Sequence, residues 1–346
     1  MRNARHDVGF ALNGQRTIDG SSLGVGVRLE RVATTYRTGI GADSGASIDA
    51  RQLLGTAFVQ YEASIVRRVT VATGVSLAQL GTRAYGSSQA ELRWRASNVV
   101  SFSAGIVQQH QFVQSLRNEE SIAGNVFPAD LFIAADARTV PVARSTQGVL
   151  SARYHPHPGV RLNAVAYVRR VKDVLMVAPD DGAPFAVRAF SLGEGASRGM
   201  ALDAAISTAR VGLTANYGFQ RVQLASSRNT YVPTYGDVHV LSTGVIVFPT
   251  PTLSVRLGLS GSAGRRTSNV VGSFEWESCN LRDRGCEFGG SPLTDPSALG
   301  LTRLPVYARA DVGVRKHWHL HTGARDLGGG FGFEETVLRV RIRQVL

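Results

Sequence analysis

Apolar and polar residues alternate one by one along most of this chain. Between residues 251 and 262 the apolar positions are Leu253, Val255, Leu257 and Leu259, and each is flanked by small or polar residues. Successive side chains of a strand point to opposite faces of a sheet, so this segment is predicted to be a strand with one apolar and one polar face. The same period of two recurs along the whole chain, and no segment shows a convincing helical period.

Roughly fourteen segments carry this pattern, most of them about nine to twelve residues long. They cover about residues 8–13, 23–30, 53–63, 69–77, 89–96, 100–106, 150–154, 160–169, 199–207, 211–219, 238–248, 253–260, 306–315 and 335–346, with a weaker strand at 317–324. Four longer segments lack the alternation, at about 113–145, 178–196, 225–235 and 264–304. Short turns such as HPHPG (155–159) and PTP (249–251) separate other pairs of strands.

Strands of this length, with short turns at one end, long loops at the other and one apolar face, are typical of outer-membrane barrels. The pattern therefore predicts an all-β fold, namely a transmembrane antiparallel up-and-down β-barrel. With roughly fourteen strands and long extracellular loops, we expect it to be a partial barrel. We expect residues 1–346 to form a single barrel domain without a plug domain. A soluble all-β sandwich, propeller or repeat protein is the alternative, although no internal repeat of fixed period favours a propeller.

Composition agrees with a membrane protein that crosses with strands. Charged residues make up 18% of the chain, against about 25% in soluble domains. No stretch approaches the roughly 20 apolar residues of a membrane helix, and the N-terminus lacks the apolar core of a secretory signal. The net charge of +12 comes almost entirely from arginine. It indicates either an anionic partner or a genome that uses arginine wherever a cation is tolerated.

In a barrel the apolar face contacts lipid and the polar face lines the lumen. The predicted lumen-facing arginines are Arg93, Arg161, Arg256, Arg309, Arg339, Arg341 and Arg343. The last three also fit a row of charge that discourages pairing at a sheet edge, or a basic stripe for an anionic solute or nucleic acid. Aromatic residues near strand ends are candidates for an interfacial girdle, namely Trp94, Tyr154, Phe248 and Trp318.

The sequence offers little catalytic chemistry. Cys279 and Cys286 lie close together in a polar, glycine-containing segment, which favours a small loop disulfide, with two free thiols or a metal site as alternatives. No histidine lies close enough in sequence to complete a four-ligand metal pattern. The glycine-rich segment 328–333 does not open a helix, so a turn is favoured over a phosphate loop. We expect no enzymatic activity and no cofactor.

Two stretches resemble the C-terminal barrel part of TonB-dependent receptors. The first runs from Gln111 through Asn118-Glu119-Glu120 to residues 141–148 and the strand-turn-strand that follows. The second is more specific and begins a late barrel strand in that family. Its matching residues are Arg303, Leu304, Pro305, Tyr307, Arg309, Asp311 and Gly313. The chain departs from the family in its smaller number of strands, the lack of a plug domain and energy-coupling box, and its final residue, Leu346.

The resemblance implies the barrel of an active transporter of the bacterial outer membrane, present here as a fragment or a truncated paralogue. An intact relative would take up a scarce, large solute such as an iron chelate, cobalamin or a glycan. The expected partners are outer-membrane lipid and lipopolysaccharide, a small or medium-sized solute for which the arginines favour an anion, and the TonB system only if a plug is supplied. A passive porin-like channel is the alternative within the membrane. A soluble basic all-β binding protein is the alternative outside it, and no nucleic acid partner is expected.

Overall fold

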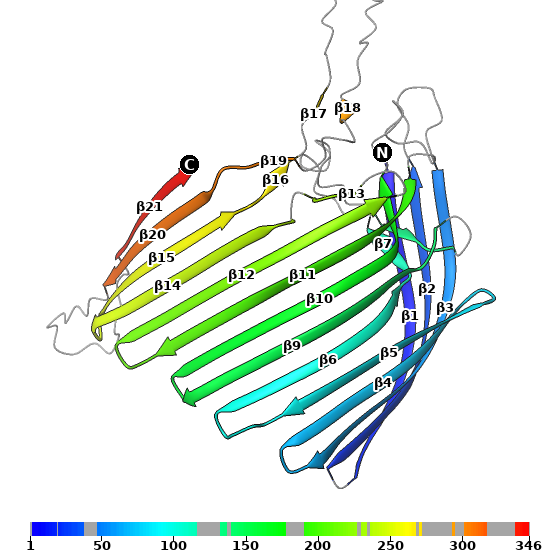
Figure 1. Cartoon of the computed structure of the whole chain (residues 1–346), viewed down its shortest axis with the longest axis horizontal. Helices are drawn as coiled ribbons and strands as arrows, with labels where there is room; N and C mark the ends of the chain where they lie inside the picture. The colour runs from blue at the N-terminus through cyan, green and yellow to red at the C-terminus, as the bar shows by residue number, and fades with distance from the viewer. Residues whose placement is uncertain are drawn as a thin grey trace, which may run out of the picture.

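The structure is a computed structural model of the whole chain, and it contains strands and connections (Figure 1). It describes residues 2–18, 20–37, 47–115, 132–136, 140–177, 190–226, 230–233, 236–267, 270–271, 293–294, 301–316 and 336–345. Among these residues, no helix is long and apolar enough to span a membrane.

In the part of the chain that the structure describes, fourteen strands follow one another in a single antiparallel sheet, and β13 (Thr230–Tyr231) pairs with β12 beside this path. The fourteen are β1 (Arg2–Ile18), β2 (Ser21–Arg37), β3 (Ser47–Val66), β4 (Val69–Leu80), β5 (Arg83–Trp94), β6 (Val100–Gln111), β9 (Ala143–His157), β10 (Val160–Val177), β11 (Phe190–Ser207), β12 (Val211–Ser226), β14 (Val238–Thr250), β15 (Leu253–Ala263), β20 (Tyr307–Lys316) and β21 (Thr336–Val345). The predicted all-β, up-and-down architecture and the predicted number of strands are therefore confirmed.

The connections differ at the two ends of the sheet. Six connections at one end contain two to five residues, and they include the turns after β9 and β14 that the sequence predicted. Most connections at the other end are longer, with the two-residue β4–β5 turn at Gly81 as an exception. Several strands are also longer than expected. The longest of those described is β3, which has 20 residues. At about 3.3 Å per residue, such a strand extends well beyond the hydrocarbon core of a bilayer.

The sheet curls into a trough, with β1–β3 on one side and β20–β21 on the other (Figure 1). Its apolar side chains are highly exposed on the convex face. Val8 is 73% exposed and Phe10 is 67% exposed, whereas a water-soluble protein would bury such residues. The residues between them, such as Gly9 and Ala11, belong to the other face, where the polar residues of neighbouring strands lie. One face of the wall is thus built for an apolar environment.

The second irregular segment is shorter than the sequence predicted, because β11 already begins at Phe190 rather than near residue 199. Residues 191–199 of β11, SLGEGASRG, hide the alternation because glycine stands at positions where an apolar or polar side chain is expected. Close packing explains this glycine content. A Cβ at Gly193 would lie 2.8 Å from the carbonyl oxygen of Ala225 and would overlap the sulfur of Met176. Strand β12 likewise continues to Ser226, beyond the predicted end.

The first irregular segment folds back over the concave face. Its described part contains the hairpin β7 (Val113–Ser115) and β8 (Phe132–Ala134), which packs against β2 and β3, and β9 begins within the segment, at Ala143. The Ala134 amide donates a hydrogen bond to Thr34 Oγ1 at 2.9 Å, across 100 positions of sequence. The predicted loop at 113–145 therefore contains strands, and part of it folds over the concave face. Its described residues 113–115, 132–136 and 140–142 are called the cover.

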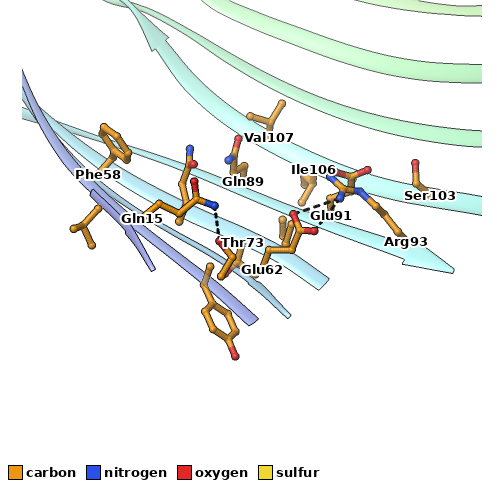
Figure 2. Close-up of a pocket in the computed structure, with 18 of the residues that line it drawn as sticks. Gln15, Phe58, Glu62, Thr73, Gln89, Glu91, Arg93, Ser103, Ile106 and Val107 are labelled. Carbon is orange, nitrogen blue, oxygen red and sulfur yellow. Dashed lines mark hydrogen bonds and ion pairs between the residues drawn. The ribbon is translucent and has the colours of Figure 1, made fainter. Parts of the chain in front are cut away.

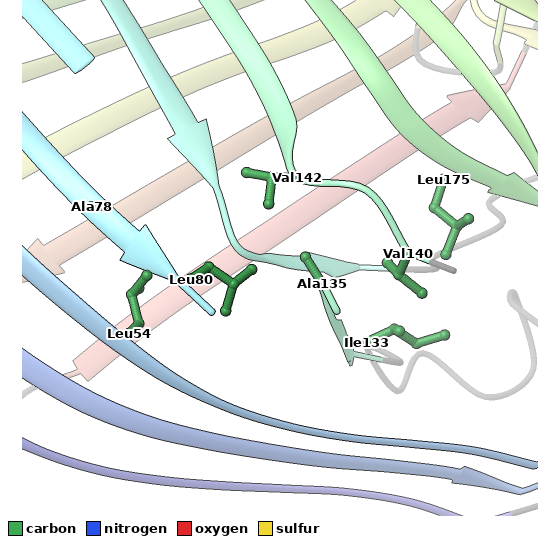
Figure 3. Close-up of a cluster of buried hydrophobic side chains, with 8 residues drawn as sticks. All are labelled: Leu54, Ala78, Leu80, Ile133, Ala135, Val140, Val142 and Leu175. Carbon is green, nitrogen blue, oxygen red and sulfur yellow. The ribbon is translucent and has the colours of Figure 1, made fainter. Parts of the chain in front are cut away.

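The hairpin supplies the most buried apolar residues of the described chain (Figure 3). Ile133 is fully buried and Val140 nearly so, in a cluster with Leu80 of β4 and Leu175 of β10. Gln114 completes the link, because its side chain donates to Pro141 O and Asp173 O and accepts from the Leu175 amide at 2.7 Å. Buried polar groups that are fully paired rigidify such a contact. The cover thus joins strands that lie several positions apart in the sheet.

The fourth irregular segment also contains strand structure that the sequence did not predict. Two short antiparallel pairs lie in it, β16 (Arg266–Thr267) with β19 (Thr302–Arg303) and β17 (Val270–Val271) with β18 (Leu293–Thr294). Cys279, Cys286, Trp318, the predicted weak strand at 317–324 and the glycine-rich segment 328–333 lie outside the described residues.

Candidate functional site

A cavity of about 860 Å³ lies on the concave face between β1 and β9. Polar side chains from alternate strands line it, including Gln15 of β1, Glu62 of β3, and Gln89 and Glu91 of β5 (Figure 2). Gln60 of β3 also belongs to the lining. These residues share one face because the registers of adjacent strands place them in rows across the sheet. The polar face of the wall is therefore the one that encloses space.

The charged residues of the cavity form one cluster. Arg93 Nη2 donates to Glu91 Oε2 at 2.7 Å, and Arg93 Nη1 lies 3.4 Å from both carboxylate oxygens of Glu62. These three are the charged residues of the cavity lining, and two carboxylates with one guanidinium leave a formal charge of −1. The side chain of Arg93 is about half exposed, so the pairs are worth little in stability, but they do neutralise the arginine. This part of the concave face therefore does not favour an anion.

The other predicted lumen-facing arginines differ in their partners. Arg309 Nε lies 2.7 Å from Asp311 Oδ2 on the same face of β20. Arg161 and Arg256 are exposed and form no ion pair with the described residues. They share the face of Arg93 by register, since the rows of the sheet connect it to β10 and β15. Of the four arginines whose side chains the structure describes, Arg93 and Arg309 are thus paired with carboxylates. Arg161 and Arg256 have no carboxylate partner among the described residues and are available to a solute.

Three of the predicted arginines lie on β21, where the structure describes the backbone. Arg339, Arg341 and Arg343 occupy register positions opposite Gly313, Asp311 and Arg309 of β20. All seven arginines therefore occupy positions of one face of the sheet, as the alternation predicted. Their contact with a lumen remains a prediction.

The family-like motif spans the entry to β20. Arg303 pairs with Arg266 in the β16–β19 ladder, and the Leu304 amide donates to Arg265 O at 2.8 Å. Pro305 precedes the strand, which begins at Tyr307 and places Tyr307, Arg309, Asp311 and Gly313 at alternate positions. The motif thus begins a late strand, as the resemblance implied.

Three of the predicted girdle aromatics lie near the ends of strands that are joined by short turns. Trp94 stacks on Phe102 with ring centroids 5.6 Å apart, and both are exposed on the convex face. Tyr154 and Phe248 are also exposed. Trp and Tyr rings at this position, which have a polar group beside an apolar body, suit a membrane interface.

The most regular feature of the cavity is a row of glutamines, which the sequence alone does not reveal. Gln15 lies opposite Gly24, Gly24 opposite Gln60, Gln60 opposite Gly74 and Gly74 opposite Gln89. The row continues through Val107 to Gln147 of β9. The glutamines are scattered in the sequence, and only the strand registers bring them together. Among the described residues, no group of three or more His, Cys, Asp or Glu side chains is placed to hold a metal ion.

No protein-family model and no curated protein matches this sequence. Solved structures do match its fold. The FrpB iron transporter from Neisseria meningitidis superimposes with a TM-score of 0.59 at 12% identity, covering 91% of this chain and 48% of that one. The copper transporter OprC gives a TM-score of 0.59 at 13% identity, with coverages of 90% and 48%. The siderophore receptor PirA from Pseudomonas aeruginosa gives 0.56 at 9% identity, with coverages of 91% and 53%.

The chain spans about half the length of these proteins. The similarity confirms the predicted resemblance at the level of the fold, and it agrees with the predicted location in the bacterial outer membrane. With its two-faced wall, short turns and long loops, this chain has the fold of the barrel of TonB-dependent outer-membrane receptors.

Proposed function

We propose that this chain forms wall and loops of an outer-membrane receptor that takes up a scarce, large solute. The exposed apolar convex face carries the proposal, because a wall with residues such as Val8 and Phe10 fully in water would aggregate. In lipid the same face is stabilising and the polar concave face lines a water-filled space. The names of the similar structures, an iron transporter, a copper transporter and a siderophore receptor, support a role in solute uptake.

The residues are proposed to form one barrel domain whose partners on the outside are lipid and lipopolysaccharide. A bilayer offers no hydrogen bonds to an open sheet edge, so the wall must be closed in the membrane. Coupling to the TonB system would require a plug domain in the lumen. The long connections at one end, with the inward-folded cover between β6 and β9, are placed to select what enters.

Two measurements test the proposal in a Gram-negative host that exports the chain. The protein should be recovered in the outer-membrane fraction and should require detergent for extraction. Recovery in the soluble fraction without detergent would contradict the membrane wall. In planar bilayers, steady open-channel current steps from the purified chain would contradict the receptor and indicate a passive porin instead.

A further inference from the structure

We infer that the cavity between β1 and β9 is a binding subsite for an uncharged, hydroxyl-rich chain, that is, an oligosaccharide. The inference rests on the proposed uptake function, and it narrows the solute to one chemical class. Three features of the concave face support it: the glutamine row, an aromatic ring beside that row and the local charge.

The glutamine row presents hydrogen-bonding groups at regular spacing. Gln15, Gln60, Gln89 and Gln147 occupy alternate strands of one row. Strands lie about 4.8 Å apart, so successive glutamines are about 10 Å apart. An amide offers both donors and an acceptor, as a sugar hydroxyl does, and carries no charge. Such a row suits a ligand that repeats its hydroxyls along its length.

The glycines between these residues give the amides room to reach across the sheet. A Cβ at Gly74 would lie 3.0 Å from Gln89 Nε2 and 3.3 Å from Gln60 Cγ, so both side chains lean over this position. Gln15 Nε2 donates to Ser22 Oγ at 2.9 Å. Within the described part of the chain, the amides of Gln60, Gln89 and Gln147 make no side-chain hydrogen bond. Their donors and acceptors are therefore available to a solute.

An aromatic ring lies next to the row. A Cβ at Gly26 would come within 2.5 Å of Phe58 Cζ and 2.6 Å of Asn13 Oδ1, so the ring lies over the backbone of Gly26. Phe58 also lines the cavity, as Figure 2 shows. A pyranose ring has an apolar face bordered by hydroxyls, and it can cover such a ring while its edges meet the amides. Apolar surface with a few convergent polar groups is the usual make-up of a ligand site.

The charges favour a neutral solute over an anionic chelate. Arg93 is paired with both Glu62 and Glu91, and the lining carries a formal charge of −1. Arg153 of β9 acts on Glu91 from outside the lining and offsets this charge, so the cavity offers no net positive charge to an anion. The paired carboxylates and guanidinium still have capacity to bond hydroxyls beside the amide row.

Equilibrium binding to the purified full-length chain tests the inference, in an amine-oxide detergent because maltoside detergents would compete. The probes are neutral hexasaccharides with glucose, mannose, galactose or N-acetylglucosamine units, and ferric citrate as the anionic chelate. We expect at least one hexasaccharide to bind. The double variant Gln60→Ala/Gln89→Ala should weaken it at least 10-fold, and Gly74→Val should weaken it comparably while keeping all four amides.

The matched control is Gln79→Ala, which removes an amide from the opposite face of β4 and should change binding less than 2-fold. Absence of binding by every hexasaccharide would overturn the inference. Binding that is unchanged in the double variant and in Gly74→Val would also overturn it. Membrane insertion is scored on the same samples, so a chain that inserts but binds only ferric citrate refutes the subsite and leaves the proposed receptor in place.

Discussion

The wall and the inward-folded cover treat apolar side chains in opposite ways. On the wall, Phe10 is 67% exposed and Leu150 is 62% exposed, both on the convex face. In the cover, Ile133 is 0% exposed and belongs to one buried cluster with Leu54, Leu80 and Leu175. In the proposed function the apolar convex face of the wall contacts lipid, whereas the cover builds a small core against the concave face. Apolar side chains of one chain thus have two environments, an exposed convex face on the wall and a buried core in the cover.

This difference decides what the sequence could predict. Alternation is local, so each wall strand was visible on its own. In β15, for example, Leu253, Val255, Leu257 and Leu259 lie on one face and Arg256 lies on the other. The cover was not visible, because its burial depends on contacts across the sheet such as Thr34 with Ala134. The glutamine row was missed for the same reason, since it exists only after β1 to β9 are placed in register. Glycine at Gly193 hid the start of β11.

The largest effect is expected at the centre of the cover. Ile133→Ala removes a fully buried side chain, so it should cost about 2–5 kcal/mol of cover docking. Hydrogen exchange of the Ala134 and Ala135 amides should accelerate, while the wall amides keep their protection. The matched control is Leu150→Ala on the convex face, where the side chain is 62% exposed. Equal effects of the two variants would erase the contrast between wall and cover.

A charge on the convex face should have the next largest effect. Leu257→Arg should cost about 2–4 kcal/mol of barrel stability near the bilayer midplane, because lipid cannot solvate the guanidinium. Its neighbour Gly258 supplies the control, since a Cβ there would lie 3.8 Å from Asp311 Cβ, in ordinary contact. Ser254 is less suitable, because it is only 7% exposed. Urea unfolding in lipid vesicles measures both variants, and a Gly258→Arg protein as unstable as Leu257→Arg would mean that the faces are reversed.

A smaller effect is expected where a single hydrogen bond ties the cover to the wall. Thr34→Val keeps the shape of the side chain but removes the acceptor of the Ala134 amide, which is left buried. An unsatisfied buried N–H costs about 1–3 kcal/mol. Hydrogen exchange should show local acceleration at Ala134. Unchanged exchange there would indicate that the cover is held by apolar contacts alone.

The smallest effect is expected at the exposed ion pairs of the cavity. Arg93→Gln removes the partner of Glu62 and Glu91, but such pairs contribute about 0–1 kcal/mol when solvent-exposed. Thermal unfolding in detergent should therefore change little. A large loss of stability would show that the concave face is drier at this point than the geometry of the cavity indicates.

The central claim is that the convex face meets lipid and the concave face meets water. Spin labels at residues 256 and 257, introduced one at a time after replacing Cys279 and Cys286 by serine, test it in reconstituted vesicles. The label at 257 should collide mainly with oxygen, which concentrates in lipid, and the label at 256 mainly with a water-soluble nickel complex. Equal accessibility of both labels to the nickel complex would contradict a membrane wall.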